Sequence, residues 1–295
     1  MSTERAIDRM GGRRNVLITG ASSGIGRACV NRLDREGYRV FAAVRRSADG
    51  EAVESGGSAR IHAILVDVTD SESIVRALAT VADITGTAGL HGLVNNAGIA
   101  VAGPLEALPL VDLRRQLEVN LLGQLAMVQA FLPMLRSAKG RIVNMSSVSG
   151  RIAFPMIGSY CISKSALEAL SDALRLELRG TGVGVSVVEP GVIDTPIWGK
   201  SVPLGRHMVD ALPGEMRERY GPLADAVEAE SRRARRGATP CDRVADAVVH
   251  ALFARRPRTR YIVGRDAWLA IHVLNHFPTR LRDWVIMRGL GRSSR

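Results

Sequence analysis

Short apolar runs alternate with longer amphipathic segments along most of this chain. The apolar runs have the length of β-strands and fall at residues 15–19, 38–44, 61–69, 92–98, 140–146, 183–189 and 260–263. Apolar residues at helical spacing predict helices over 112–136, 159–179 and 242–253. Strands that alternate with helices form a parallel sheet with right-handed connections. The pattern therefore predicts an α/β fold with a doubly wound parallel sheet.

The other segments extend this core without forming a separate domain. A chain of 295 residues with 46% hydrophobic content can bury one α/β core, so we expect a single domain over 1–295. Residues 13–200 hold the predicted core. Residues 196–237 are irregular in pattern, and we expect them to cover the site as a substrate lid. Residues 265–295 are a C-terminal helical extension that is apolar on one face.

Polar residues and glycines gather where the predicted strands end. Ligands of doubly wound sheets bind beyond the carboxyl ends of the strands. The residues at those ends are Gly20, Arg45, Asp67, Asn95, Ser147 and the pair Pro190-Gly191. Their shared position predicts that they line one site.

A glycine-rich turn follows the first predicted strand and leads directly into a helix. Its residues are Gly20, Ser22, Ser23, Gly24, Ile25 and Gly26. Glycine permits positive φ and close backbone approach, and a helix N-terminus offers unpaired N–H groups to a phosphate. The turn therefore predicts a pyrophosphate site, although its G-x-x-x-G-x-G spacing differs from the commoner G-x-G-x-x-G.

Two arginines, Arg45 and Arg46, follow the second predicted strand, where dinucleotide folds often place an acid for the adenosine ribose. Guanidinium groups attract a 2′-phosphate through charge-assisted hydrogen bonds, whereas an acid would repel it. NADP(H) is therefore favoured over NAD(H). Two observations weigh against this preference: Asp49 is close enough to serve as a ribose ligand, and arginine is abundant throughout the chain.

Two further strand ends offer groups to the rest of a dinucleotide. Asp67 is placed to accept a hydrogen bond from an adenine amino group. The turn that runs from Asn95 through Ala97 to Gly98 has small residues that allow close approach to a ribose, and its asparagine amides can fix neighbouring strands. Both features extend the predicted cofactor site along the sheet edge.

Tyr160 and Lys164 share one face of the predicted helix over 159–179, at i, i+4 spacing. An ammonium beside a phenol favours the phenolate, and we expect Lys164 to lower the pKa of Tyr160 by roughly 2 to 3 from its ordinary value of about 10. A tyrosine tuned in this way can transfer a proton at neutral pH. The spacing alone also fits a surface tyrosine beside a solvated lysine.

Together these motifs resemble the short-chain dehydrogenase/reductase family over roughly residues 13–200, which implies a Rossmann fold. The resemblance implies a catalytic tetrad of Asn120, Ser147, Tyr160 and Lys164. In that family the tyrosine is the general acid or base and the serine hydrogen-bonds the substrate oxygen. The lysine also binds the nicotinamide ribose, and the asparagine holds a water in a proton relay.

The resemblance also implies the cofactor contacts. They comprise the glycine turn, the turn from Asn95 to Gly98, and a set made of Asp67, Val68, Tyr160, Lys164, Pro190, Gly191 and Thr195. Thr195 resembles the residue that binds the carboxamide and phosphate side of the cofactor. Members that prefer NADP often carry a basic residue inside the glycine turn. Serines occupy it here, so the preference rests on the two arginines after the second strand.

The expected reaction is hydride transfer between a nicotinamide and a carbonyl or alcohol, with Tyr160 exchanging the proton. An apolar wall at 154–157 and the lid favour a lipophilic substrate. The long C-terminal extension and Arg45 are similar to the retinol and steroid dehydrogenase branch of the family. Two alternatives remain: an oxoacyl-type reductase, and a non-catalytic NADP(H)-binding regulator.

Composition restricts other classes of function. Cys29, Cys161 and Cys241 are odd in number and lack metal-type spacing, which favours reduced thiols. No uninterrupted apolar run reaches membrane-spanning length and the start lacks a signal-peptide core, so we expect a cytoplasmic protein. The net charge of +11 comes mainly from arginine without a nucleic-acid-binding motif, so no specific nucleic-acid binding is expected.

Further expectations concern metals and partners. His272 and His276 lie at i, i+4 without other ligands, so we expect no metal site. The apolar face of residues 265–295 is expected to pack within the protein, although a subunit contact or a peripheral membrane contact among its arginines would also fit. The family resemblance implies a homodimer or homotetramer through the helices at 112–136 and 159–179.

Overall fold

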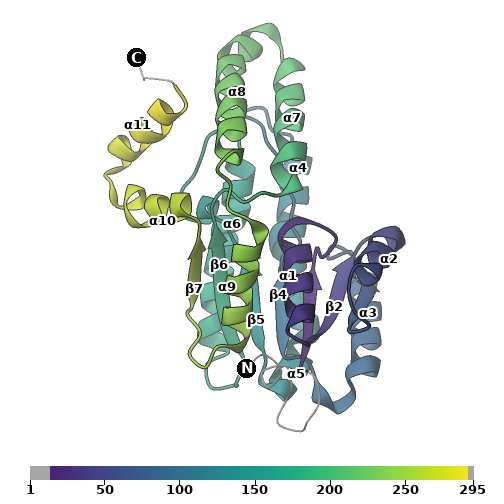
Figure 1. Cartoon of the computed structure of the whole chain (residues 1–295). Helices are drawn as coiled ribbons and strands as arrows, with labels where there is room; N and C mark the ends of the chain where they lie inside the picture. The colour runs from purple at the N-terminus through teal and green to yellow at the C-terminus, as the bar shows by residue number, and fades with distance from the viewer. Residues whose placement is uncertain (1–13, 292–295) are drawn as a thin grey trace.

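Seven parallel strands form the centre of the molecule in the computed structural model, which describes residues 14–291 (Figure 1). Their order across the sheet is β3-β2-β1-β4-β5-β6-β7. Successive strands are therefore added on one side of β1 up to β3, and on its other side from β4 onward. The strands are β1 (Asn15–Thr19), β2 (Arg39–Val44), β3 (Ile61–Leu65), β4 (Gly92–Asn95), β5 (Arg141–Met145), β6 (Gly184–Pro190) and β7 (Arg260–Val263). This confirms the predicted doubly wound sheet.

Helices cover both faces of the sheet. On one face, α1 (Gly24–Arg35) packs against α9 (Cys241–Phe253), and their apolar side chains form a core with the strands. On the other face, α3 (Ser71–Thr85), α5 (Gly123–Ala138) and α6 (Gly158–Glu177) enclose a second core. The short α2 (Ser47–Ser55) packs on β2 and β3. Because both faces are covered, the central strands are buried along their whole length.

The helix predicted over 112–136 consists of three consecutive parts. It begins as α4 (Leu110–Leu117), passes through one π-helical segment, η3 (Glu118–Leu122), and continues as α5. The whole stretch, 110–138, is long and apolar enough to cross a membrane, and 33% of its most apolar window is buried in the protein. Met127, Phe131 and Leu135 are fully buried against the sheet, so part of that apolar character belongs to the core.

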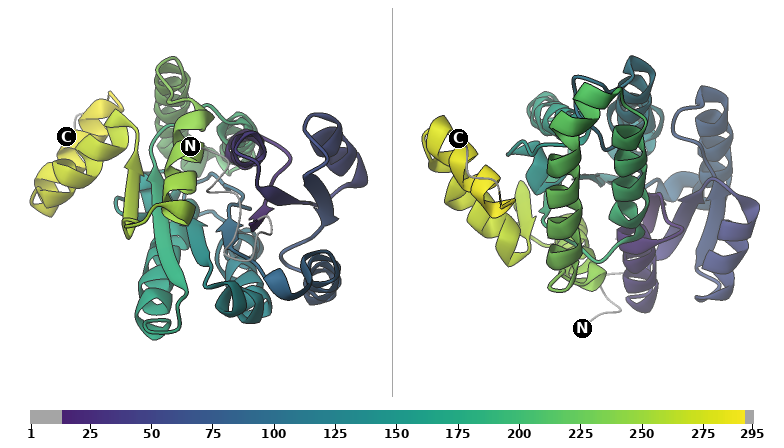
Figure 2. Two further views of the ribbon diagram at one scale, coloured as in Figure 1. Left: turned by 60° about the horizontal axis from the view of Figure 1, so that its bottom comes forward. Right: turned by 90° about the horizontal axis from the view of Figure 1, so that it is seen from above.

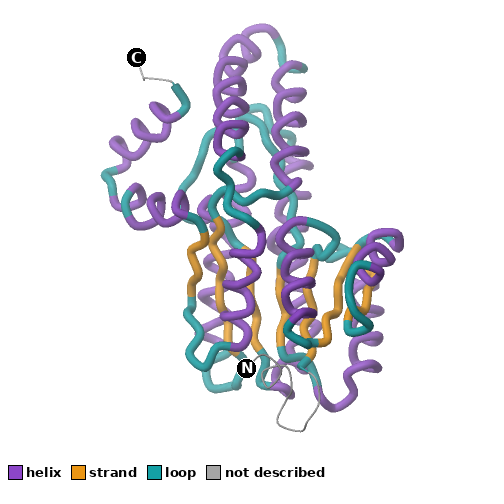
Figure 3. Tube along the Cα trace, in the orientation of Figure 1, coloured by secondary structure: helices purple, strands orange, loops and turns teal. Residues whose placement is uncertain are grey.

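The segment with an irregular pattern, 196–237, forms two helices. They are α7 (Pro196–Asp210) and α8 (Gly214–Arg235), which pack against each other and rise beyond the carboxyl edge of the sheet (Figures 1 and 3). No secondary structure was assigned to this segment from the sequence. Pro203 and Pro222 lie inside the helices and interrupt the pattern by which helices are recognised.

The C-terminal extension is helical, as predicted. It consists of α10 (Arg265–His272), a short turn η5 (Leu274–His276) and α11 (Thr279–Gly289). It projects to one side of the sheet beyond β7, away from α2 and α3 (Figure 2). Trp268, Leu269 and Trp284 remain 55%, 56% and 43% exposed, so only part of its apolar face packs within the protein.

Candidate active site

The predicted catalytic residues meet at the carboxyl edge of the sheet. Ser147 follows β5 and precedes the turn η4 (Val148–Gly150), while Tyr160 and Lys164 lie in the first two turns of α6. Tyr160 is 7% exposed and Lys164 is 3% exposed, which excludes the interpretation as a surface pair. The Lys164 Nζ lies 5.7 Å from the centre of the Tyr160 ring and donates a 2.7 Å hydrogen bond to the Met145 carbonyl.

Burial controls the ionisation of both groups. It raises the pKa of Tyr160 to about 12, while a hydrogen bond with Ser147 acts in the opposite sense. It also lowers the pKa of Lys164 to about 8, against the field of the Glu168 carboxylate. The expected lowering of the Tyr160 pKa by Lys164 is therefore wrong for the protein alone. Desolvation disfavours the charged form of each group more strongly than Ser147 favours the Tyr160 phenolate or Glu168 favours the Lys164 ammonium.

Asn120 lies in the π-helical segment η3, and its side chain is fully buried. Its amide joins two segments: Oδ1 accepts from Ile99 N and Nδ2 donates to Ile99 O, both at 2.9 Å, and Nδ2 also donates to Ser163 Oγ at 3.0 Å. Ser163 in turn donates to the Tyr160 carbonyl. Asn120 therefore contacts α6 at Ser163, one helical turn after Tyr160. Isolated π-helical turns often occur at functional sites.

The glycine turn has the conformation that a phosphate cradle requires. Gly20 and Gly24 have φ of 65° and 54°, and a Cβ at Gly20 would lie 2.9 Å from the Ala97 Cα. Ser23 begins α1 without a side-chain capping bond, so the helix N-terminus presents its N–H groups to the turn. Gly26 packs so closely that a Cβ would lie 2.2 Å from the Gly20 carbonyl oxygen. The turn fits a pyrophosphate.

Other predicted cofactor residues surround this turn. Thr195 lies above it, since a Cβ at Gly24 would be 3.3 Å from its Cγ2 atom. Ala97 and Gly98 follow β4 and face the turn and Asn120, respectively. At the adjacent strand ends, Arg45 is exposed, and Asp67 accepts two hydrogen bonds from Thr69 that lower its pKa.

Comparison with known proteins supports the same assignment. The family model described as short chain dehydrogenase matches residues 14–203. This chain belongs to the short-chain dehydrogenase family. Within the family, it is 41% identical to mouse retinol dehydrogenase 16, over 91% of this chain and 86% of that protein. It is 39% identical to human 17-beta-hydroxysteroid dehydrogenase type 6, over 92% and 87%. It thus falls in the retinol and steroid dehydrogenase branch.

Solved short-chain dehydrogenases have the same fold. A Streptomyces avermitilis enzyme superposes with a TM-score of 0.75 at 29% identity, covering 95% of this chain and 98% of its own. A Burkholderia cenocepacia enzyme in complex with NADP has a TM-score of 0.69 at 27% identity, covering 92% and 96%. As a member of this branch, the protein is an oxidoreductase that acts on CH–OH and C=O groups.

Some predicted residues of this short-chain dehydrogenase serve the scaffold. Asn95 is fully buried, and its amide donates to Asn144 Oδ1 and Gln124 O, which joins β4 to β5 and α5. Val68 is buried beside Gly123 at the start of α5. Arg46 forms two 2.9 Å hydrogen bonds with Asp49, so the two candidates for the ribose region neutralise each other.

Other residues shape the short-chain dehydrogenase site in ways that the sequence analysis did not specify. Thr19 Oγ1 accepts from Asn96 N and Ala97 N, and Asn96 Nδ2 donates to the carbonyls of Thr19 and Gly20. These bonds fix the glycine turn to the turn after β4. Asp266 accepts from Val192 N and occupies the space beside Gly191, so α10 supports the Pro190-Gly191 turn. Asn96 belongs to the turn whose asparagine amides were expected to fix neighbouring strands, and Thr19 directly precedes the glycine turn.

The first turn of α7 contributes an aromatic residue beside Tyr160. Trp198 in the first turn of α7 contacts the Tyr160 ring edge to face, with centroids 5.4 Å apart and an interplanar angle of 75°. Met156 on the opposite wall packs with Val209 of α7 and Ala224 of α8. Trp198 of α7 therefore lies against Tyr160, while the far end of α7 and the middle of α8 pack on Met156.

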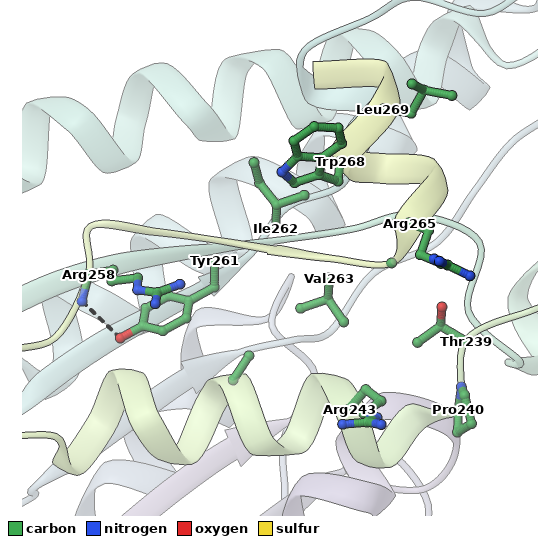
Figure 4. A pocket seen from close by; sticks show the side chains of 12 residues that line it. Thr239, Pro240, Arg243, Arg258, Tyr261, Ile262, Val263, Arg265, Trp268 and Leu269 are labelled. Atoms are coloured by element: carbon green, nitrogen blue, oxygen red, sulfur yellow. Dashed lines mark hydrogen bonds between the residues drawn. The ribbon is translucent and has the colours of Figure 1, made fainter. Parts of the chain in front are cut away.

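A separate groove of about 880 Å³ lies between α9, β7 and α10 (Figure 4). Tyr261, Val263 and Trp268 contribute apolar surface, and Arg243, Arg258 and Arg265 line its margins. None of the predicted site residues lines this groove, so it is distinct from the dehydrogenase site. No group of three or more potential metal ligands occurs within residues 14–291.

Proposed function

We propose that this protein is an NADP(H)-dependent dehydrogenase/reductase of lipophilic alcohols and carbonyl compounds, with Tyr160 as its general acid or base. The observation that carries the proposal is the arrangement at the sheet edge. Tyr160 and Lys164 lie buried side by side at the carboxyl ends of the strands, beside Ser147 and beneath Trp198 of the lid. A non-catalytic cofactor sensor would have no need of this buried proton-transfer pair.

The cofactor is expected across the carboxyl edge of the sheet. Its pyrophosphate would be held by the glycine turn and the first turn of α1, with Thr195 above them. A 2′-phosphate would meet Arg45 at the end of β2, whose charge also lowers the pKa of the neighbouring Asp67. Because Asp49 engages Arg46, we assign the larger part of the NADP(H) preference to Arg45.

When bound, the nicotinamide supplies or accepts the hydride. The protein contributes the remaining steps of the reaction. In reduction, Tyr160 donates its proton to the carbonyl oxygen, and the Ser147 hydroxyl stabilises the negative charge that develops there. Lys164 holds a positive charge beside the phenol as the proton leaves, and Asn120 with Ser163 fixes the first turns of α6. In oxidation Tyr160 accepts the proton instead.

Apolar side chains support a lipophilic substrate. Trp198 contacts Tyr160 from the lid, and the stretch 154–157 with Met156 forms the other wall. A retinol dehydrogenase and a hydroxysteroid dehydrogenase, whose names specify lipophilic alcohols, are similar over more than nine tenths of this chain. We therefore place retinoid, steroid or fatty carbonyl compounds ahead of sugars.

The proposal is tested by following oxidation of NADPH and of NADH with a panel of carbonyl compounds. The panel contains a retinal, a 17-ketosteroid, a long-chain aldehyde, an oxoacyl thioester and pyruvate as a small polar control. We expect turnover with at least one lipophilic compound, a higher kcat/KM with NADPH than with NADH, and no turnover of pyruvate. Tight NADPH binding without turnover of any compound would favour the regulator, and preference for the thioester would favour the oxoacyl reductase.

We also propose a cytoplasmic homo-oligomer whose C-terminal extension makes peripheral membrane contact. Exposed Trp268, Leu269 and Trp284, with neighbouring arginines, support contact with an anionic bilayer. Sedimentation with vesicles of phosphatidylcholine and phosphatidylserine tests this part, because replacing both tryptophans by alanine should then reduce binding. Light scattering of the purified protein tests the oligomer independently.

A further inference from the structure

A buried network of charges lies behind the catalytic lysine. Glu168 is one helical turn after Lys164 on the same face of α6, and it is 6% exposed. Its Oε2 accepts a 3.0 Å hydrogen bond from Arg260 of β7. Arg260 also binds Asp172 at 2.8 Å and Glu189 of β6 at 3.2 Å. The network therefore joins the catalytic helix to the last two strands of the sheet.

The other carboxylate oxygen of Glu168 lacks such a partner. Its Oε1 is buried and accepts no hydrogen bond from an N–H or hydroxyl group in the described part of the chain, although a protonated Glu189 is placed to hydrogen-bond the Glu168 carboxylate. A buried charged oxygen without a partner is costly, so its retention requires a compensating interaction. Lys164 lies one helical turn away on the same buried face, without an ion pair to Glu168 within 4.0 Å, and the Glu168 carboxylate supports its positive charge against the effect of burial.

Several other charged residues surround Lys164 and Glu168. Arg151, after η4, is 3.3 Å from Glu189 and 3.9 Å from Glu168. Burial, and then the nearby Glu168 carboxylate, raise the pKa of Glu189 to about 7, so Glu189 holds a proton against the ionised Glu168 just below the pH at which Lys164 titrates. Arg175 binds Asp172 at the outer end of the network. The α4 and η3 segments, which also pack on α6, carry only unburied charges: Asp112, Arg114, Arg115 and Glu118.

We propose that Glu168 is a positioning residue for the reaction: its buried carboxylate is the counter-charge that keeps Lys164 protonated beside Tyr160. Arg260 and Arg151 hold Glu168 in place without using its second oxygen. The role rests on the proposed function, in which Lys164 acts as a cation. It explains how a lysine that is only 3% exposed retains its charge near neutral pH.

The ionisation of Lys164 can be measured directly. The chain has only three lysines, Lys139, Lys164 and Lys200, so protein labelled with ¹³C at the lysine Cε gives three signals, and the Lys164 signal is identified by its loss in Lys164→Met. In the wild type, that signal should titrate at a pH of about 8. In Glu168→Gln, we expect the titration to move down by about one pH unit, because the favourable charge is lost.

Asp172→Asn is the matched control, because Asp172 shares Arg260 with Glu168 but is 40% exposed and one further turn from Lys164. It removes one carboxylate from the same network, and it should move the Lys164 titration by less than about 0.3 pH unit, since solvent screens it. An unchanged Lys164 titration in Glu168→Gln, or an equal shift in both variants, would overturn the proposal. If Glu168→Gln fails to fold, Glu168→Asp is the substitute, because it keeps the charge on a shorter side chain. We then expect a smaller downward shift of the Lys164 titration, and an unchanged Lys164 titration in Glu168→Asp would overturn the proposal.

The titration needs neither cofactor nor substrate, so it answers the question even if no carbonyl compound is turned over. Where turnover exists, a second readout follows in the direction of carbonyl reduction. Loss of the Glu168 charge favours both the neutral amine of Lys164 and the phenolate of Tyr160, and both changes disfavour proton donation. The alkaline decline of kcat/KM should therefore move to lower pH in Glu168→Gln, and remain in place in Asp172→Asn.

Discussion

The sheet core and the helix pair α7–α8, the proposed lid, differ in how they are held together. The core has two large apolar clusters, one on each face of the sheet, with many fully buried residues. The lid has one small cluster, in which Val209 and Ala224 are the buried apolar residues of α7 and α8. Elsewhere the lid relies on exposed ion pairs such as Arg206 with Asp210 and Arg219 with Glu106. Such pairs contribute little stability.

This difference separates two requirements of the proposed reaction. Proton transfer requires groups that are held still, and Ser147, Tyr160 and Lys164 are all fixed to core elements. Admission of a substrate requires a segment that opens at low free-energy cost, and the lid has few buried contacts to break. Trp198 is the point at which the two regions touch beside the catalytic phenol.

The largest expected effect comes from removing one oxygen atom from the core. In Tyr160→Phe, kcat should fall by at least about 100-fold, because the general acid is lost. The affinity for NADPH should change little, since the glycine turn and Arg45 remain. Stopped-flow or steady-state kinetics with the best carbonyl compound, together with fluorescence titration of NADPH, measure both quantities. Turnover close to that of the wild type would show that the chemistry does not depend on this residue.

A matched pair of substitutions compares the stability of the two regions. Val143 in β5 and Val209 in α7 are both fully buried valines. Val143→Ala should lower the free energy of global unfolding by about 2 kcal/mol, from the lost methyl groups and the cavity that remains. Val209→Ala should leave global unfolding nearly unchanged, and accelerate hydrogen exchange in α7 and α8 instead. Denaturant unfolding and hydrogen exchange by mass spectrometry distinguish the two results; equal loss of global stability would mean that the lid and core unfold together.

The next test concerns the cofactor end of the core. Arg45→Ala should weaken NADPH binding by about tenfold, the loss expected for one charge-assisted hydrogen bond to phosphate, and leave NADH binding unchanged. Arg46→Ala is the control with a smaller expected effect, because Asp49 already binds that guanidinium. Calorimetric titration with each cofactor gives the two affinities. Equal weakening of NADH in Arg45→Ala would show that the arginine does not read the 2′-phosphate.

The sequence was most informative for the core, where each motif lies at the end of a buried strand. Strand length, the helix that carries Tyr160 and the glycine turn follow from local pattern, because a parallel sheet covered on both faces needs apolar strands and because glycine alone tolerates the positive φ at positions 20 and 24. The lid was not recognised as helical, because Pro203 and Pro222 interrupt its pattern.

The environment of the catalytic pair could not be read from spacing. Helical spacing correctly placed Lys164 beside Tyr160, but the direction of the Tyr160 pKa depends on burial, which long-range packing determines. The π-helical turn at Asn120 and the network of Glu168, Glu189 and Arg260 also join segments far apart in the chain. Neither leaves a local signature in the sequence.

The smallest expected effect tests the contact between the two regions. Trp198→Ala removes the lid's aromatic contact with Tyr160, and such contacts contribute about 0.5–1.5 kcal/mol. We expect KM for a lipophilic carbonyl compound to rise about three- to tenfold while kcat stays near the wild-type value, because the proton-transfer groups belong to the core. Trp268→Ala, in the exposed part of α10, is the control and should leave both constants unchanged. A fall in kcat with unchanged KM would show that Trp198 helps to position the proton-transfer groups. The separation of substrate admission in the lid from proton transfer in the core would then be wrong.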